Sequence, residues 1–316
     1  MAFGAACLQA AGRKLIGCSD VLYEEARIKE KQKKRDSAGL RFLYGTFVGR
    51  AVLSLLTKRS ISKMCGAFLD SRLSRGLIRG FVEKNAIDLG ECENTDFRCF
   101  NDCFTRKLRP ELRLFSTNEN DFCAPCDGLL SIYPITGNTV LPIKQSCYNI
   151  PSLLEDVELA ERFRNGLCLV FRLCVNHYHR YAYVDNGVKG ENVFIKGELH
   201  TVRPIALEQY PVFMRNCREY TVMETEHFGT MVQVEVGAML VGRIQNHMGA
   251  GNFVRGTEKG MFLYGGSTIV VLLEPHRVTL CEELAAHVAT GEEIPVRMGQ
   301  TLGHADDGAS GEKHDA

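Results

Sequence analysis

The chain has 316 residues, enough for one large domain or two modest ones. Its hydrophobic fraction of 45% and charged fraction of 24% are those of an ordinary globular protein, which excludes a disordered or fibrous chain. Lys and Arg total 38, and Asp and Glu also total 38, so no overall positive field favours nucleic-acid binding.

The charges are unevenly spread along the chain. Residues 27–35 read RIKEKQKKR, further basic residues follow as far as Arg79, and the last residues are acidic. A basic N-terminal quarter is compatible with a solvated surface. It is equally compatible with attraction to anionic lipid headgroups, which contributes about 1 kcal/mol per basic residue near the surface.

The cysteine count points to a reducing compartment. There are 13 cysteines, an odd number, and residues 1–20 lack the apolar core and cleavage site of a secretory signal. The longest apolar stretch, residues 40–56, is interrupted by Arg41 and Arg50 and is too short to cross a bilayer. We therefore expect a cytosolic protein that lies peripherally on the cytoplasmic face of a membrane.

The first part of the chain has the apolar spacing of helices. Residues 1–38 are predicted to form a poorly ordered basic segment. From about 39 to 86 apolar side chains recur at helical spacing, and a further short helix is predicted over 96–108, ended by Arg109-Pro110. Residues 39–120 are thus predicted to form a helical, membrane-facing region.

After residue 121 the pattern changes to short β-like runs separated by turn residues. We expect a β-rich catalytic domain over 121–303 and a disordered acidic tail over 304–316. The predicted fold is α+β, with an N-terminal helical region packed on a β-rich catalytic body. The predicted strands are 129–133, 168–175, 181–184, 193–195, 220–224, 231–236, 240–244, 261–264 and 269–273.

The run Gly265-Gly266-Ser267-Thr268 lies between two apolar segments. Two glycines allow a sharp bend that side chains would forbid, and they expose the carbonyl before Ser267 to attack. Ser267 is therefore a candidate nucleophile against its own chain. The alternative is an ordinary turn, because Gly-Ser turns are common.

Two other polar clusters occur in the β-rich part, at Asp127-Gly128 and at His177-Tyr178-His179-Arg180. With Ser267 they give the order Asp, His, Ser. A serine needs a base near neutral pH, a histidine can serve, and an aspartate can hold the tautomer of that histidine. The alternatives are a simple Asp-Gly turn and a structural core histidine.

These segments resemble the phosphatidylserine decarboxylases, which carry a pyruvoyl prosthetic group made from their own backbone. The resemblance runs from about residue 40 to 303. The matching segments are FNDCFTRKL (100–108) with Pro110, APCDG (124–128), YHRY (178–181) with DNG (185–187), VGAMLVG (236–242), and EKGMF (258–262) leading to GGST (265–268).

The resemblance implies two stages. First, Ser267 attacks the carbonyl of Gly266, helped by His179 and Asp127, and the chain splits between 266 and 267, leaving a pyruvoyl group on fragment 267–316. Second, this group forms a Schiff base with phosphatidylserine in an anionic membrane and accepts the electrons left by carbon dioxide, so that phosphatidylethanolamine is released. His179 is also implied in proton transfer at that stage. Fragment 1–266 is expected to stay with 267–316, and a homo-oligomer is possible.

The sequence departs from the family pattern at two positions. Many members read Asp-Tyr-His-Arg-x-His, whereas here Ala182 stands at the second histidine and His177 at the opening aspartate. His179 matches a family position and is the predicted base. In a β-strand residues 177 and 179 point to the same face, so the choice between them stays open.

Two other functions are compatible with these residues. Cys123, Cys126, His177 and His179 would make a Cys2His2 zinc site, although their spacing is far from the compact finger pattern. A zinc protein would keep an intact chain with stoichiometric metal. A non-processing, membrane-docking relative, in which Ala182 has cost self-cleavage, would keep an intact chain without metal.

Overall fold

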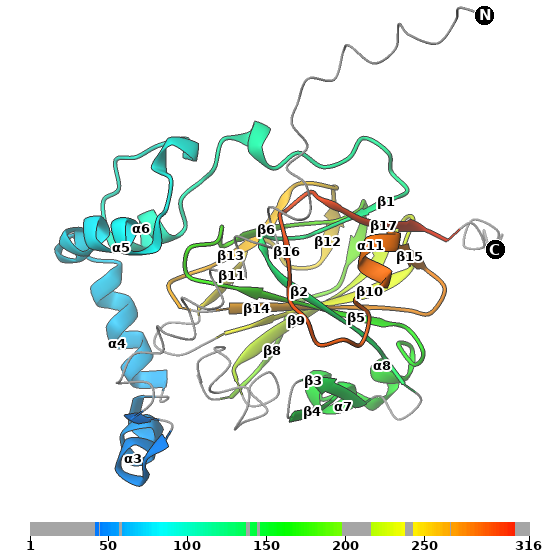
Figure 1. Ribbon diagram of the computed structural model, residues 1–316, viewed down its shortest axis with the longest axis horizontal. Helices are drawn as coiled ribbons and strands as arrows, with labels where there is room; N and C mark the ends of the chain where they lie inside the picture. Colours follow the sequence, from blue (N-terminus) through cyan, green and yellow to red (C-terminus); the bar gives the residue numbers. More distant parts are fainter. Residues whose placement is uncertain are drawn as a thin grey trace, which may run out of the picture.

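A nine-stranded antiparallel sheet forms the centre of the molecule (Figure 1). The computed structural model describes residues 42–43, 45–56, 59–136, 140–143, 146–197, 216–237, 243–265 and 267–306. The sheet has the strand order β12 (Gly251–Phe253), β7 (Gly187–Lys189), β9 (Arg218–Thr225), β10 (Thr230–Val236), β14 (Ser267–Leu273), β5 (Leu167–Leu173), β2 (Gly128–Pro134) and β16 (Ile294–Val296), and β8 (Val193–Ile195) also pairs with β9.

The central strands are buried and mostly apolar because both faces of the sheet are covered. In β14, every residue from Ser267 to Leu273 is buried. Val270 and Leu272 join one core cluster, whereas Ile269 and Val271 join the other. Alternate side chains thus enter opposite layers, as the period of a strand requires.

Helices cover one face of this sheet and two small sheets cover the other. Helices α7 (Ile150–Leu154) and α8 (Val157–Glu161) lie against the first core cluster. The small sheets contribute Phe122, Tyr181 and Phe262 to the second. They consist of β1 (Asp121–Cys123), β17 (Thr301–Ala305) and β15 (Val278–Leu280), and of β11 (Ile244–Asn246), β13 (Glu258–Phe262) and β6 (Arg180–Ala182). The remaining elements of the body are the hairpin β3 (Val140–Ile143) and β4 (Ser146–Asn149), and helix α11 (Glu282–Ala285).

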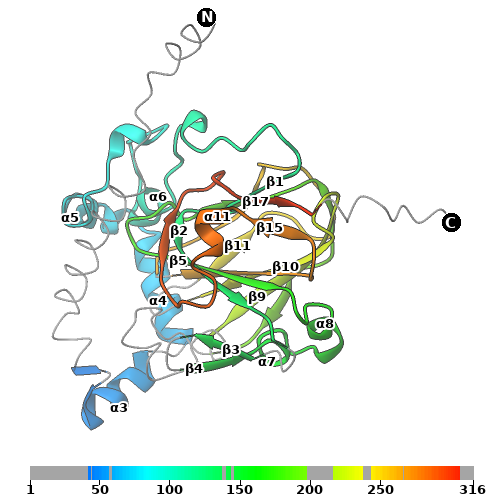
Figure 2. The ribbon, with the colours of Figure 1, turned by 45° about the vertical axis from the view of Figure 1, so that its right-hand side comes forward.

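The N-terminal helices lie to one side of the β-sheet body, as Figures 1 and 2 both show. A small cluster attaches them to the body, in which Phe100 and Phe104 pack with Leu69, Phe81 and Tyr264. These helices are α3 (Phe47–Leu56), α4 (Arg59–Leu69), η1 (Arg72–Leu77), α5 (Ile78–Asn85), η2 (Leu89–Glu91), α6 (Phe100–Phe104) and η3 (Pro110–Leu112). In the part of the chain that the structure describes, no helix is both long and apolar enough to span a bilayer.

The predicted α+β class is confirmed, with differences in extent. The helix predicted over 96–108 is reduced to Phe100–Phe104, because residues after Arg106 pair with the 91–93 segment through a bridge of Leu108 with Cys92. Strand β17 continues to Ala305, past the predicted boundary at 303. The predicted segment 1–38 and most of the predicted strand 240–244 lie outside the described residues.

Candidate active site

Ser267 is the first residue of β14 and lies opposite Leu173 of β5. It is 1% exposed, and its Oγ is buried with no hydrogen-bond partner. An unsatisfied buried hydroxyl costs about 1–3 kcal/mol, and such groups in native structures usually have a functional reason. Gly265 has φ of 142°, a value that favours glycine. Gly266, on the other side of the predicted cleavage site, lies outside the described residues.

Three predicted polar clusters lie at the same end of the strands in the large sheet. Because β14, β5 and β2 are adjacent and antiparallel, the start of β14, the end of β5 and the start of β2 lie side by side. Asp127 comes directly before β2. His177 follows β5 in a turn closed by its N–H, which donates to the carbonyl of Cys174. Sheet topology thus brings Asp127, His177 and Ser267, which are 50 to 140 positions apart in the sequence, to the same end of the sheet.

His179 is fully buried and is tied to the segment that leads into Ser267. Its carbonyl accepts a hydrogen bond from the Phe262 N–H at 2.9 Å. Its ring lies 4.1 Å from the ring of Phe104, which in turn packs 5.2 Å from the ring of Tyr264. The strand β13 and the aromatic cluster therefore both hold His179 next to the chain that ends in the Gly-Gly-Ser turn.

Hydrogen-bond partners assign the tautomer of His179. Its Nδ1 lies 2.9 Å from the carbonyl oxygen of His177, which can only accept, so Nδ1 carries the proton. Its Nε2 is buried without a partner and holds the lone pair. Burial lowers the pKa of His179 well below its ordinary value, and the charges of Arg106 and His177 lower it further. His179 is therefore a neutral base at Nε2.

In His177 the two ring nitrogens have the opposite roles. The Cys174 N–H donates to Nδ1 of His177 at 3.1 Å, so this nitrogen accepts and Nε2 carries the proton. Burial lowers the pKa of His177 to about 4, although the nearby charge of Asp127 opposes that shift. At its second nitrogen the neutral ring can donate but not accept. This geometry favours His179 over His177 as the base.

Asp127 is held by Arg113. The Arg113 guanidinium donates from Nε and Nη2 to the two carboxylate oxygens, both at 2.7 Å, and the Met298 N–H donates to Oδ1 at 2.9 Å. Both side chains of the ion pair are about nine-tenths buried. The partner of His179 Nδ1 is a backbone carbonyl, so the predicted contact between Asp127 and His179 is not among the described hydrogen bonds. A direct role of Asp127 stays a prediction.

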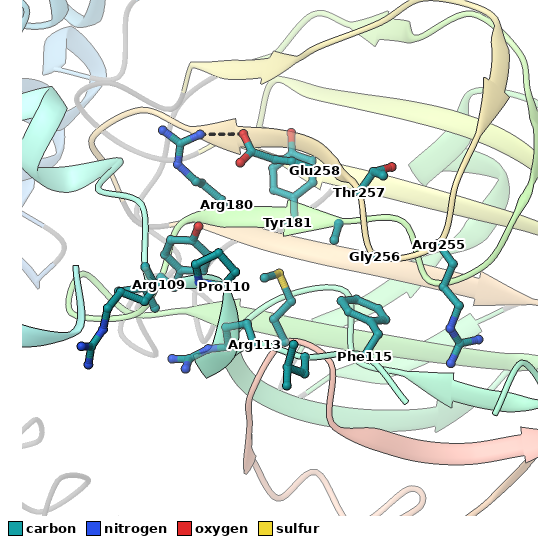
Figure 3. Close-up of a pocket in the computed structure, with 15 residues that line it drawn as sticks. Arg109, Pro110, Arg113, Phe115, Arg180, Tyr181, Arg255, Gly256, Thr257 and Glu258 are labelled. Atoms are coloured by element: carbon teal, nitrogen blue, oxygen red, sulfur yellow. Dashed lines mark hydrogen bonds and ion pairs between the residues drawn. The ribbon is translucent and has the colours of Figure 1, made fainter. Parts of the chain in front are cut away.

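A pocket of about 400 Å³ is lined by Arg113 and Met298, the two residues that bind Asp127, and Ser267 is not in its wall (Figure 3). Ala182 lies in its wall, and the Ala182 N–H donates to the carbonyl of Pro125, two residues before Asp127. The guanidinium groups around it are already engaged, since Arg180 pairs with Glu258 at 2.6 Å and Arg255 donates to backbone carbonyls.

The four residues of the predicted zinc alternative do not assemble. Cys123 and Cys126 are fully buried. Across the described ranges no group of three or more His, Cys, Asp or Glu side chains is placed to hold a metal ion. The geometry thus gives no support to a site built from these cysteines with His177 and His179.

Sequence reasoning gave no role to two arginines of this region. Arg106 lies within the FNDCFTRKL segment but was not singled out as a site residue. Arg113 had no signal at all, because an arginine after a proline-containing turn is ordinary in sequence. Only the fold shows that Arg113 binds Asp127 and that Arg106 binds the turn before His179.

Known proteins resemble this chain over most of its length. A family model described as phosphatidylserine decarboxylase matches residues 100–304. The chain is 39% identical over 279 residues to phosphatidylserine decarboxylase proenzyme 2 of Clostridium acetobutylicum, covering 88% of this chain and 95% of that protein. It is 40% identical over 274 residues to the phosphatidylserine decarboxylase proenzyme of Ruminiclostridium cellulolyticum, covering 85% and 91%. With the proenzyme of the same name from Chlamydia muridarum it shares 38% over 284 residues, covering 87% and 93%.

Proposed function

The chain belongs to the phosphatidylserine decarboxylase family, and we propose that it is a self-processing, pyruvoyl-dependent enzyme that converts phosphatidylserine to phosphatidylethanolamine and carbon dioxide. One observation carries the assignment of the site. Ser267 Oγ and His179 Nε2 are both buried, and neither has a hydrogen-bond partner. Because no other group engages either atom, the hydroxyl is available as a nucleophile and the ring nitrogen as its base.

In the proposed cleavage, His179 Nε2 takes the hydroxyl proton of Ser267 as Oγ bonds to the carbonyl carbon of Gly266. The peptide bond becomes an ester, and the nitrogen of Ser267 becomes a free amine. Loss of the Cα proton and of the ester oxygen from Cβ then releases fragment 1–266 with a carboxylate end. Water replaces the nitrogen on fragment 267–316, ammonia leaves, and a pyruvoyl group results. The low pKa of His179 supports this role, because the base is unprotonated at neutral pH.

The surroundings of Ser267 fit such a group. The residue is buried at the start of a strand that is paired along its whole length with β5, so a new chain end there stays in place after cleavage. When formed, the pyruvoyl group would supply a carbonyl that accepts the electrons left by carbon dioxide. Burial of Ser267 and His179 supports a site that excludes water, in which His179 Nε2 would move a proton.

Membrane contact is proposed for the N-terminal helices. Phe47 and Leu73 are 82% and 83% exposed, and Met64 is 64% exposed. Exposed basic side chains lie in the same helical region, among them Arg72, Arg75 and Arg79, of which the last two pair with Asp96 and Glu83. Exposed apolar groups with neighbouring cations favour a surface of anionic lipid. We therefore place the protein peripherally on the cytoplasmic face of a membrane, where its lipid substrate is found.

The mass of the purified protein under denaturing conditions tests this function. The expected result is two fragments, 1–266 and 267–316, with the smaller one blocked to Edman chemistry. Ser267→Ala is expected to give one chain of 35.3 kDa that releases no carbon dioxide from phosphatidylserine vesicles. An intact wild-type chain would refute self-processing and favour the non-processing relative. A cleaved and active Ser267→Ala protein would end the assignment of Ser267.

A further inference from the structure

Arg106 follows helix α6 and is a buried cation beside the two histidines. It is 5% exposed. Its Nη2 donates to the carbonyl oxygens of Asn176 at 2.9 Å and His177 at 3.3 Å, and its Nη1 lies 3.5 Å from the carbonyl of Phe104. Its Nε is buried without a partner. Within the described part of the chain, backbone carbonyls are its only hydrogen-bond partners.

Such an arrangement is unusual for a buried charge. Removing a guanidinium from water is costly unless a carboxylate compensates it. Arg172 shows the ordinary solution, since it is equally buried and forms two hydrogen bonds of 2.8 and 2.7 Å with Glu293. Burial lowers the pKa of Arg106, whereas the pKa of Arg172 is raised. A charge kept without a carboxylate partner next to the predicted reaction centre indicates a function for that charge.

The carbonyl of His177 is shared between Arg106 and His179. It accepts from Arg106 Nη2 and also from the Nδ1–H of His179. A carbonyl oxygen has two lone pairs, so both bonds form at once. The guanidinium therefore fixes the peptide group that decides on which nitrogen His179 carries its proton.

We propose that Arg106 is a positioning residue for self-cleavage, which holds the His177 carbonyl against the Nδ1–H of His179 and so presents the Nε2 lone pair to Ser267. The proposal rests on the self-processing function and adds a residue to it. It also explains why this cation has no carboxylate partner, because a neutralised Arg106 would not oppose protonation of the histidine.

The charged groups around the two rings are consistent with this role. Arg106 and His177 are the groups whose charges lower the pKa of His179 after burial. Around His177, Arg172, Arg106 and Arg113 lower the pKa, and Asp127 alone raises it. Removing the charge of Arg106 is therefore expected to raise the pKa of His179 toward its ordinary value.

The test follows self-cleavage of the full chain after short cell-free synthesis, with the product moved to buffers between pH 5 and 8. Arg106→Met keeps the length of the side chain without its charge. We expect cleavage about tenfold slower at pH 7.5, because the Nε2 lone pair of His179 is no longer held toward Ser267, and a half-maximal rate at a higher pH than in the wild type, because the charge that opposes protonation is gone. Arg106→Lys keeps the charge and is expected to restore most of the wild-type pH profile.

Arg218 provides a matched control. It is 1% exposed and donates from Nε to the carbonyl of Leu153 at 2.6 Å and from Nη2 to that of Ser152 at 2.8 Å, and Nη2 also lies 3.4 Å from Glu155, a carboxylate partner that Arg106 does not have. Arg218→Met is expected to lose stability without moving the pH midpoint. An Arg106→Met protein with the wild-type midpoint would overturn the proposal, even if its cleavage were slow.

A second measurement does not depend on cleavage. In the Ser267→Ala chain, nitrogen-15 NMR of the histidines is expected to show the Nδ1–H tautomer for His179, and Arg106→Met is expected to mix or invert it. An unchanged tautomer would refute the positioning role. If Arg106→Met does not fold, Arg106→Gln, which removes the charge and keeps an N–H donor, takes its place in the pH measurement, and a wild-type midpoint would again overturn the proposal. An uncleaved wild-type chain would instead refute self-processing, whatever the tautomer is.

Discussion

The buried ion pair of Lys259 and Glu235 gives a quantitative prediction for the replacement Lys259→Met. Both side chains are fully buried, and Nζ lies 2.7 Å from Oε1. The same ammonium donates to Asn246 at 2.9 Å, and Gln233 donates to Glu235 at 2.9 Å. The pair joins β13, which leads to Ser267, to β10 of the large sheet. Removing the ammonium leaves a buried carboxylate without its cation, which costs about 3–5 kcal/mol of unfolding free energy. At about 1.4 kcal/mol per factor of ten, the folding equilibrium constant falls by about two to more than three orders of magnitude.

Urea unfolding in the Ser267→Ala background measures this loss, because that chain is not expected to be cut and unfolds as one molecule. The double replacement Lys259→Met with Glu235→Leu removes both charges. It is expected to recover at least half of the loss, since apolar residues can replace a buried pair at little cost. A loss below about 1 kcal/mol for Lys259→Met would refute the reasoning, and so would a double variant less stable than the single one.

Further predictions concern the histidines and the membrane. His179→Ala is expected to block processing more than His177→Ala, as measured by the ratio of cut to uncut chain; the reverse order would make His177 the base. Wild-type cleavage should keep its rate as the pH falls from 7.5 through 6.5, because the pKa of His179 lies well below 6.5, and a rate that halves near 6.5 would contradict this. The folded-state pKa of His177 is lowered to about 4, so the unfolded chain binds its proton first. Stability in urea is therefore expected to fall between pH 6.5 and 4, with a slope from this residue of at most about 1.4 kcal/mol per pH unit. Replacing Phe47 and Leu73 by Glu should weaken flotation with phosphatidylserine vesicles at least about tenfold without changing cleavage, because each loses apolar area that would enter the lipid. Val157→Glu, on α8 and 66% exposed, is the control, and an equal loss there would argue against a membrane face on the N-terminal helices.

The long strands were easier to predict from the sequence than the contacts around the candidate site residues. β14 was visible because buried aliphatic residues fill both of its faces, and β10 because valine recurs at every second position. The three-residue strands β7 and β12 are too short to show any period, and their pairing is set by partners far along the chain. Ser267 and His179 stood out through local motifs, whereas the contact of Arg106 with the carbonyl of His177 joins residues 71 positions apart. No local pattern specifies a backbone carbonyl as the partner of a ring nitrogen, so this part of the site required the fold.

The position of β14 has a consequence for how the protein folds and for whether it can refold after denaturation. Residues 267–306 supply β14 to the middle of the large sheet, β16 to its edge and β17 to a second sheet, each paired with strands from before the cut. An uncut chain assembles these pairs within one molecule, where closing even a long loop has a modest entropy cost. After cleavage the same assembly is bimolecular and depends on concentration. The mature protein is therefore expected to be long-lived while folded, yet unable to regain its structure once denatured and diluted, whereas the Ser267→Ala chain refolds at any dilution.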